Sequence, residues 1–169
     1  MKAVILYTTK TGTVQKCVQR LKDLLDADAI DLSQHGCELS AYDTVILGGS
    51  IRMGRVQKPL RRFMAANEAA LTQKRLGLFL CSAFTDQTNM ESYFKANFPQ
   101  SLRMHALICA GFGGELEPAC LKGMDRLVAG MVAKLQGGIS VQVDDTAIVH
   151  FAQKMQAKDD EPQKGQSCL

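Results

Sequence analysis

Short apolar runs alternate along the chain with segments whose apolar residues recur at helical spacing. The runs are rich in aliphatic and β-branched side chains and predict strands at 2–7, 44–49, 75–82 and 103–110, with a further short strand at 27–32. Helical periodicity between them predicts helices at 13–26, at about 57–71 and at 88–97. In the first of these helices, Val14, Val18 and Leu21 share one apolar face. Strands that alternate with helices in this way predict an α/β protein with a parallel sheet covered on both faces.

The chain after residue 118 adds further elements to this plan. A broad apolar stripe from Cys120 to Leu135 predicts one more helix, which Gly137-Gly138 ends. The segment 140–143 (SVQV) is a candidate short strand, and a last helix is expected to start near Asp145, with that residue as its N-cap. The tail at 159–169 is polar and expected to be disordered, so residues 1–158 are predicted to form a single domain.

Composition restricts the class of protein. Of the 169 residues, 46% are hydrophobic and 22% are charged, and the formal net charge of +3 is too weakly basic to predict nucleic-acid binding. The apolar runs are far shorter than the roughly 20 residues that cross a bilayer, so no transmembrane segment is expected. The N-terminus shows no signal-peptide pattern, and the predicted location is therefore the cytoplasm.

The cysteines and histidines show no pattern typical of a metal site. None of the six cysteines forms a CxxC pair, and the three histidines do not lie at ligand spacing beside them. We therefore predict no metal. Cys81 and Cys109 lie within apolar runs and are interpreted as small buried side chains, and disulfides are not expected in this compartment.

Four of the predicted strands are followed by loops of unusual composition. The loops are TTKTGT (8–13), GGSIRMG (48–54), CSAFTDQT (81–88) and AGFGGELEP (110–118). In a doubly wound sheet the carboxyl ends of parallel strands lie at one edge, where ligands bind at the point at which the strand order reverses. We therefore expect these four loops to converge on one binding site.

The first loop has the chemistry of a phosphate site. Gly12 allows the backbone to bend toward an anion, the hydroxyls of Thr9 and Thr11 donate hydrogen bonds, and the following helix N-terminus supplies positive potential. The loop matches neither the dinucleotide pattern GxGxxG nor the triphosphate pattern GxxxxGK[ST], so a monoester phosphate is the expected occupant. The alternative is a threonine-rich helix cap that binds nothing.

Two of these loop sequences resemble those of a known family. YTTKTGT is similar to the FMN phosphate loop of flavodoxins, with a departure at Val14, where the family pattern prefers a hydroxyl. The SIRxG core of Ser50–Gly54 resembles the quinone-dependent protoporphyrinogen oxidase branch of that superfamily. The resemblance extends to about residue 157. It implies a flavodoxin-like sheet of order 2-1-3-4-5 with helices on both faces, an extra helix after the fifth strand, and FMN as cofactor.

The resemblance also implies a set of cofactor-binding residues. The phosphate is expected on residues 9–14, namely Thr9, Lys10, Thr11, Gly12, Thr13 and Val14. The isoalloxazine ring is expected between Ser50, Ile51, Arg52, Met53 and Gly54 on one loop and Ser82, Ala83 and Phe84 on another, with Gly111, Phe112, Gly113 and Gly114 closing the other side. Phe84 and Phe112 are the candidates for ring stacking, unless they belong to the core.

Three functions remain open. The first is an FMN oxidoreductase, similar to protoporphyrinogen oxidase, that moves electrons or hydride between a small substrate (a porphyrin or a quinone) and an acceptor. The second is a flavodoxin electron carrier that acts between redox proteins, and the third is an interaction domain without flavin. The segment after the fourth strand is short and not basic, unlike the insert of the membrane-associated oxidases, which favours the soluble members of the branch. No catalytic residue and no oligomeric state is predicted.

A basic stretch follows the second loop. It contains Arg52, Arg55, Lys58, Arg61 and Arg62 and is either a solvated surface or a docking site for an acidic partner or for the propionates of a porphyrin. If Arg52 lies close to the ring, its positive charge is expected to raise the midpoint potential of the flavin.

Overall fold

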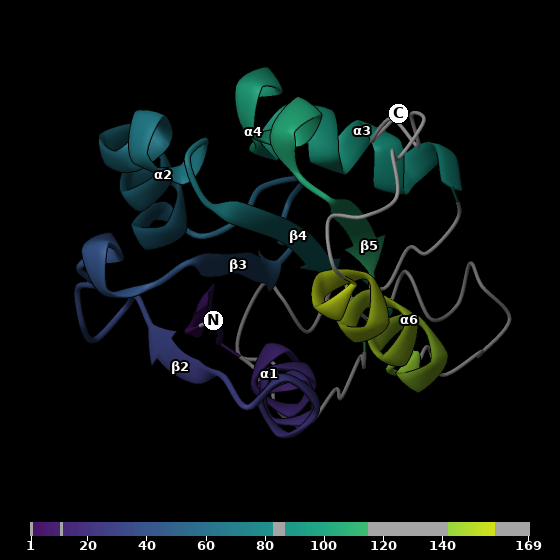
Figure 1. The fold of residues 1–169 in the computed structure, drawn as a ribbon. Coiled ribbons are helices and arrows are strands. Elements are labelled where there is room, and N and C mark those ends of the chain that lie inside the picture. Colours follow the sequence, from purple (N-terminus) through teal and green to yellow (C-terminus); the bar gives the residue numbers. More distant parts are fainter. Residues whose placement is uncertain (1, 11, 83–86, 115–141, 158–169) are drawn as a thin grey trace, which may run out of the picture.

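A five-stranded sheet forms the centre of the molecule. The computed structural model of the chain describes residues 2–10, 12–82, 87–114 and 142–157. The strands are β1 (Ala3–Thr8), β2 (Asp28–Asp31), β3 (Thr44–Ser50), β4 (Arg75–Cys81) and β5 (Ile108–Gly111). They are ordered β2-β1-β3-β4-β5, and every neighbouring pair is parallel (Figure 1). The predicted α/β class, the parallel sheet and the strand order 2-1-3-4-5 are therefore confirmed.

Helices cover both faces of this sheet, as Figure 1 shows. They are α1 (Thr13–Leu25), α2 (Lys58–Leu71), α3 (Gln87–Asn97), α4 (Gln100–His105) and α6 (Asp145–Gln156), with a short 3₁₀ turn, η1 (Leu39–Ala41). Helices α1 and α6 pack against one face, and α2, α3 and α4 pack against the other. Because the inner strands β1, β3 and β4 are buried on both faces, they need the continuous apolar runs by which the sequence predicts them.

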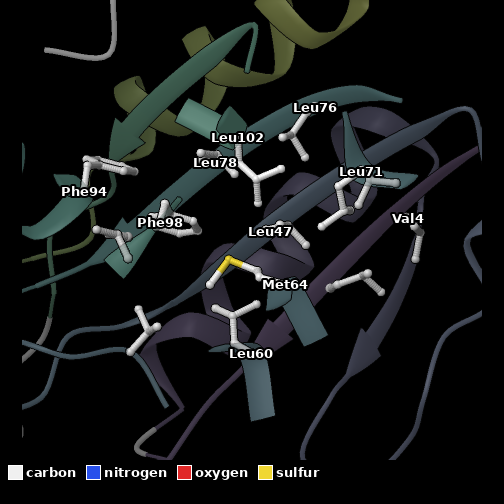
Figure 2. Close-up of a cluster of buried hydrophobic side chains, with 14 of the residues drawn as sticks. Val4, Leu47, Leu60, Met64, Leu71, Leu76, Leu78, Phe94, Phe98 and Leu102 are labelled. Atoms are coloured by element: carbon white, nitrogen blue, oxygen red, sulfur yellow. The ribbon is translucent and has the colours of Figure 1, made fainter. Parts of the chain in front are cut away.

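Two hydrophobic clusters fill the space between the sheet and its two helical layers. The first lies under α2, α3 and α4 and is drawn in Figure 2, where Leu60 and Met64 of α2 point toward Leu47 of β3. The second lies under α1 and α6 and contains three stacked or edge-packed rings. Phe79 stacks on Phe112 with 4.8 Å between ring centroids, and Phe151 meets Phe112 edge-on at 5.3 Å.

Two predicted boundaries are wrong. The strand expected over 103–110 begins only at Ile108, because Pro99 stands at the N-cap of α4 and residues 100–105 form a helical turn that buries Leu102. Proline is well tolerated where a helix starts. The last helix is capped by Asp144 and not by Asp145, since Asp144 Oδ1 accepts a hydrogen bond from the backbone N–H of Ala147 at 3.0 Å.

Other expectations are met only in part. The candidate strand at 140–143 is represented among the described residues by one antiparallel bridge between Gly113 and Val143. The helix expected between Cys120 and Leu135 lies outside the described residues, as does the tail at 159–169. In the parts of the chain that are described, no helix is both long and apolar enough to cross a membrane.

An ion pair joins the two helices on one face of the sheet. Arg20 of α1 donates to the carboxylate of Asp145 in α6, with Nε 2.8 Å from Oδ1. The hydrogen bond and charge of Arg20 lower the pKa of the Asp145 carboxyl. Because both side chains are exposed, the pair contributes little to stability.

The close packing of Gly48 against Phe79 gives a test of the core. A methyl group at Gly48 would lie 2.0 Å from the Phe79 ring, which cannot swing away because it is stacked on Phe112. We expect Gly48→Ala to lower the free energy of unfolding by about 3 kcal/mol in urea denaturation. Gly36→Ala is the matched control, since nothing lies within 4 Å of its added methyl group. Equal stability of the two variants would contradict the packing described.

Candidate functional site

The loops at the carboxyl edge of the sheet lie next to one another because the strands that carry them are hydrogen-bonded in register. Thr8 of β1 pairs with Gly49 of β3, and Ser50 pairs with Cys81 of β4. The backbone N–H of Ser82 donates to the carbonyl of Gly113 at 3.0 Å, which joins the third loop to the fourth. The strand order reverses between β1 and β3, so the first two loops flank the position at which ligands bind in such sheets.

The first loop is shaped around Thr9 and Gly12. The Thr9 hydroxyl accepts a hydrogen bond from the backbone N–H of Gly12 at 3.3 Å, and Gly12 has a left-handed φ of 86° with open space on its Cβ side. Helix α1 follows at once, and none of the described side chains caps its N-terminus. Its first N–H groups and its positive potential are therefore available to an anion. Lys10 is exposed beside this turn.

The residues on either side of this turn are buried. Thr13 opens α1 and is 6% exposed, while Val14 is 1% exposed and packs in the core under α1. The side chain of Val14 therefore packs as part of the apolar face of the helix, and it has no group that could hydrogen-bond to a ligand. Thr8 is fully buried, and its hydroxyl has no hydrogen-bond partner in the part of the chain that the structure describes. Thr11 lies outside the described residues.

The second loop is a tight hairpin. Arg52 and Arg55 exchange backbone hydrogen bonds of 2.9 and 3.0 Å, which leaves Met53 and Gly54 as the two residues of the turn. Both have positive φ, 49° at Met53 and 75° at Gly54, as in a type I′ turn. This conformation is easy for glycine but strained for methionine, by roughly 1 kcal/mol. Met53 is also 91% exposed at the tip.

The hairpin is fastened to the end of helix α3. Asn97, the last residue of α3, accepts from the N–H of Val56 at 2.8 Å and donates to the carbonyl of Gly54 at 2.9 Å. Ser50, at the start of the loop, accepts from Gln57 Nε2 at 3.0 Å, and the other amide atom of Gln57, Oε1, is buried without a partner among the described residues. A buried acceptor of this kind needs an explanation, and a donor on a bound molecule is one.

The described residues of the third and fourth loops are largely buried. Ser82 is buried at the end of β4, and Ala83 and Phe84 lie outside the described residues. Phe112 is fully buried and stacks on Phe79, so the structure does not support its predicted role in stacking on a flavin. Gly113 is required by packing, because at its φ of 71° a Cβ would lie 2.4 Å from the carbonyl oxygen of Gln142.

The other residues predicted for these loops lie at the same edge. Gly111 ends β5 against Met90, and Gly114 is buried directly after Gly113. Ile51 is half-buried, packs against the core under α2, and donates its N–H to the Cys81 carbonyl at 2.9 Å. Whether each of these residues touches a cofactor stays a prediction.

Two buried thiols lie beneath the loops. Cys17 of α1 and Cys81 at the end of β4 are free cysteines with their sulfur atoms 3.7 Å apart. The hydrogen bond to Cys17, together with burial, raises the pKa of the Cys81 thiol well above its usual range, so this cysteine stays protonated and is a poor nucleophile. Cys109 on β5 is disulfide-bonded, which corrects the expectation that this residue is a free buried thiol.

The described part of the site is basic. Lys10 and Arg55 are exposed and Arg52 is half-exposed, whereas none of the described loop residues at 9–12, 50–57, 82 and 111–114 is acidic. Within the described ranges, no group of three His, Cys, Asp or Glu residues is arranged to hold a metal ion. The site can therefore bind an anion and a neutral or anionic ring, but its described residues offer no carboxylate or imidazole as a general base.

Sequence reasoning missed Asn97 and Gln57. Asn97 precedes Phe98-Pro99, and this position indicates the end of a helix without indicating what the side chain reaches. Its partners Gly54 and Val56 lie 43 and 41 residues away, beyond any periodic pattern.

The fold is shared with many solved structures. The flavodiiron core of Flv1 from Synechocystis sp. PCC6803 aligns with a TM-score of 0.52 at 14% identity, over 92% of this chain and 36% of that one. An oxidoreductase from Corynebacterium diphtheriae aligns with a TM-score of 0.52 at 11% identity, over 92% of this chain and 94% of that one. Two-electron reduced flavodoxin from Megasphaera elsdenii aligns with a TM-score of 0.50 at 13% identity, over 76% of this chain and 98% of that one.

At such identities these likenesses show a common fold alone, and this chain spans little more than a third of the Synechocystis structure, 36%. A search of curated proteins found no match. The sequence model of the family described as flavodoxin domain matches residues 4–142, which is most of the chain. Flavodoxin domains bind FMN, so the predicted cofactor is confirmed at the level of the family. On the strength of this match, together with the strand order and the loops at its carboxyl edge, the chain belongs to the flavodoxin domain family.

Proposed function

We propose that this chain binds FMN at the carboxyl edge of its sheet and is an oxidoreductase that moves electrons or hydride between a small substrate and an acceptor. The observation that carries the proposal is the position of two loops at the β1/β3 switch point. One is an open anion-binding turn at the start of α1, and the other is a tight hairpin fixed beside it. This pair fits a monoester phosphate joined to a flat ring.

Different residues of this chain would bind the phosphate and the ring of FMN. Thr9 and the first N–H groups of α1 would hold the phosphate, with Lys10 adding positive charge. The hairpin from Arg52 to Arg55 would lie along the ring, and the unused acceptor of Gln57 would take a hydrogen bond from the ligand. FMN, when bound, supplies the hydride and electron chemistry.

The finer proposal is an activity similar to that of protoporphyrinogen oxidase. It rests on the sequence of the second loop and on the basic residues that follow it. Of these, Arg55, Lys58, Arg61 and Arg62 are exposed, and the guanidinium groups among them can pair with the carboxylates of a porphyrin. The competing proposal is an electron carrier, which is favoured by one observation. Met53, at the hairpin tip, is 91% exposed and offers an apolar contact to a partner protein.

FMN binding is tested through Thr9. The variant Thr9→Val keeps the shape of the side chain but removes its hydroxyl, so we expect the FMN dissociation constant to rise about tenfold, the value of one hydrogen bond to a charged group. Titration with flavin fluorescence measures the change. The ratio of the riboflavin dissociation constant to the FMN dissociation constant should fall as well, because riboflavin lacks the phosphate that Thr9 would bind.

Thr72→Val is the control for this test. Its hydroxyl donates to the Ala69 carbonyl at the end of α2, next to the amino end of β4 and away from the loops. Equal loss of affinity in both variants, or no loss in Thr9→Val, would argue against phosphate binding at the first loop.

The charge of Arg52 gives a redox test. Replacing it with glutamine removes a positive charge from the loop, so electron uptake by the cofactor becomes less favourable. We expect the midpoint potential of the bound flavin to fall by about 30 mV, a tenfold change in a two-electron equilibrium. Arg62→Gln removes the same charge from an exposed position on α2 and serves as the control. A potential that does not move in Arg52→Gln would place this residue away from the ring.

The substrate class is tested with the FMN-loaded protein under anaerobic conditions. An enzyme similar to protoporphyrinogen oxidase should convert protoporphyrinogen in the presence of an added electron acceptor, at a rate well above that of free FMN. A carrier should show no such turnover and should instead exchange single electrons with redox proteins, with its two one-electron potentials well separated. The second result would favour the electron carrier and reject the enzyme.

A further inference from the structure

One side chain joins two distant parts of the candidate site. Asn97 ends helix α3 and is only 6% exposed. Its amide nitrogen donates to the carbonyl of Gly54 at 2.9 Å and to the carbonyl of Tyr93 at 2.8 Å, and its amide oxygen accepts from the N–H of Val56 at 2.8 Å. Of these three bonds only the one to Tyr93 is local to the helix. The other two reach the hairpin.

The hairpin needs such an anchor. A two-residue turn between two short arms is only marginally stable by itself, and Met53 adds strain through its positive φ of 49°. The two bonds from Asn97 hold the chain on both sides of Arg55, and the Arg55 guanidinium adds a bond of 3.1 Å to the carbonyl of Ala96 on the same helix end. Helix α3 therefore holds the carbonyl side of the Gly54 peptide group, and the turn bond from Arg55 to Arg52 holds its N–H side.

The Gly54 carbonyl cannot rotate while Asn97 holds it. The N–H side of the Gly54–Arg55 peptide is held by the turn, through the bond from Arg55 to the Arg52 carbonyl at 3.0 Å, whereas Gly54 itself has open space on its Cβ side and adds no steric restraint. The hydrogen bond from Asn97 is the contact among the described residues that fixes this carbonyl.

We propose that Asn97 is a positioning residue for the cofactor, which acts through the hairpin. By fixing the Gly54 peptide and the N–H of Val56, Asn97 presents the loop in one conformation to the ring of FMN. It thereby sets the affinity and the midpoint potential of the bound flavin. This inference rests on the proposed function, in which the hairpin lies along the ring.

Two substitutions separate the parts of this role. Asn97→Ala removes all three bonds. Asn97→Asp keeps an acceptor for the N–H of Val56 and loses the donor to the carbonyls of Gly54 and Tyr93. Asn67→Ala is the matched control, because Asn67, at a kink within α2, also donates from Nδ2 to the carbonyl four residues earlier, Phe63, at 2.9 Å, and no hydrogen bond between described residues joins its side chain to the hairpin.

Three measurements are made on each variant. Amide hydrogen exchange at residues 52–56 of the cofactor-free protein reports the hairpin directly. Flavin fluorescence gives the FMN dissociation constant, and a redox titration gives the midpoint potential. We expect faster exchange, a dissociation constant raised about tenfold and a shifted potential for both Asn97 variants, with all three unchanged in Asn67→Ala. Met53→Asn, which creates the Asn-Gly pair that type I′ turns prefer, should restore part of the affinity in the Asn97→Ala background.

The outcomes separate this inference from the proposed function. Wild-type protein that takes up no FMN would overturn the proposed function, and this inference with it. If the wild type binds FMN and the Asn97 variants show faster exchange with unchanged affinity and potential, Asn97 is merely structural and the inference is wrong. Unchanged exchange in Asn97→Ala would also overturn it. A potential that shifts in Asn67→Ala as much as in the Asn97 variants would reject the specific role of the hairpin.

Discussion

The parallel pairing of β1 with β3 is the constraint on which the site depends. Residues Ala3–Thr8 pair in register with Thr44–Gly49, and both strands are buried on two faces, so a shift of register would expose apolar side chains on both sides. This pairing brings Thr9 and Ser50 to neighbouring strand ends. A glycine at position 48 is part of the same constraint, because the Phe79 ring occupies the space that a side chain would need. The binding edge therefore follows from the packing of the core.

Rigid and strained parts alternate along this edge. The strand ends are held by the sheet, whereas the hairpin after β3 keeps a methionine in a left-handed conformation that costs roughly 1 kcal/mol. Each hydrogen bond from Asn97 contributes about the same amount, so the two bonds to the hairpin exceed the cost of the turn. The strained conformation persists because Asn97 of α3 holds the hairpin through two hydrogen bonds. Such a loop is fixed in shape while its tip stays exposed.

The sequence predicts the sheet and most helices because hydrophobic periodicity carries that information. It fails at 103–107, because Pro99 starts a helix that continues to His105 and the strand begins only at Ile108. Val14 stands at a position that belongs both to the apolar helix stripe and to the phosphate motif, where it departs from the preferred hydroxyl. Its side chain is 1% exposed, so it packs with the stripe. Phe112 follows a strand closely, and periodicity alone does not say which face its ring takes. The contacts of Asn97 could not be predicted, since a hydrogen bond across 43 residues leaves no local pattern.

The charge of the site narrows what the protein can do. Lys10, Arg52 and Arg55 lie on or beside the binding loops, and the described loop residues include no carboxylate. Positive charge around the site favours binding of an anionic phosphate. It also stabilises the form of the cofactor that carries more negative charge. The same charges attract acidic molecules, and salt weakens that attraction over about 8–10 Å. Under the proposed function, binding of the cofactor and docking of an acidic substrate or partner would therefore depend on one set of charges.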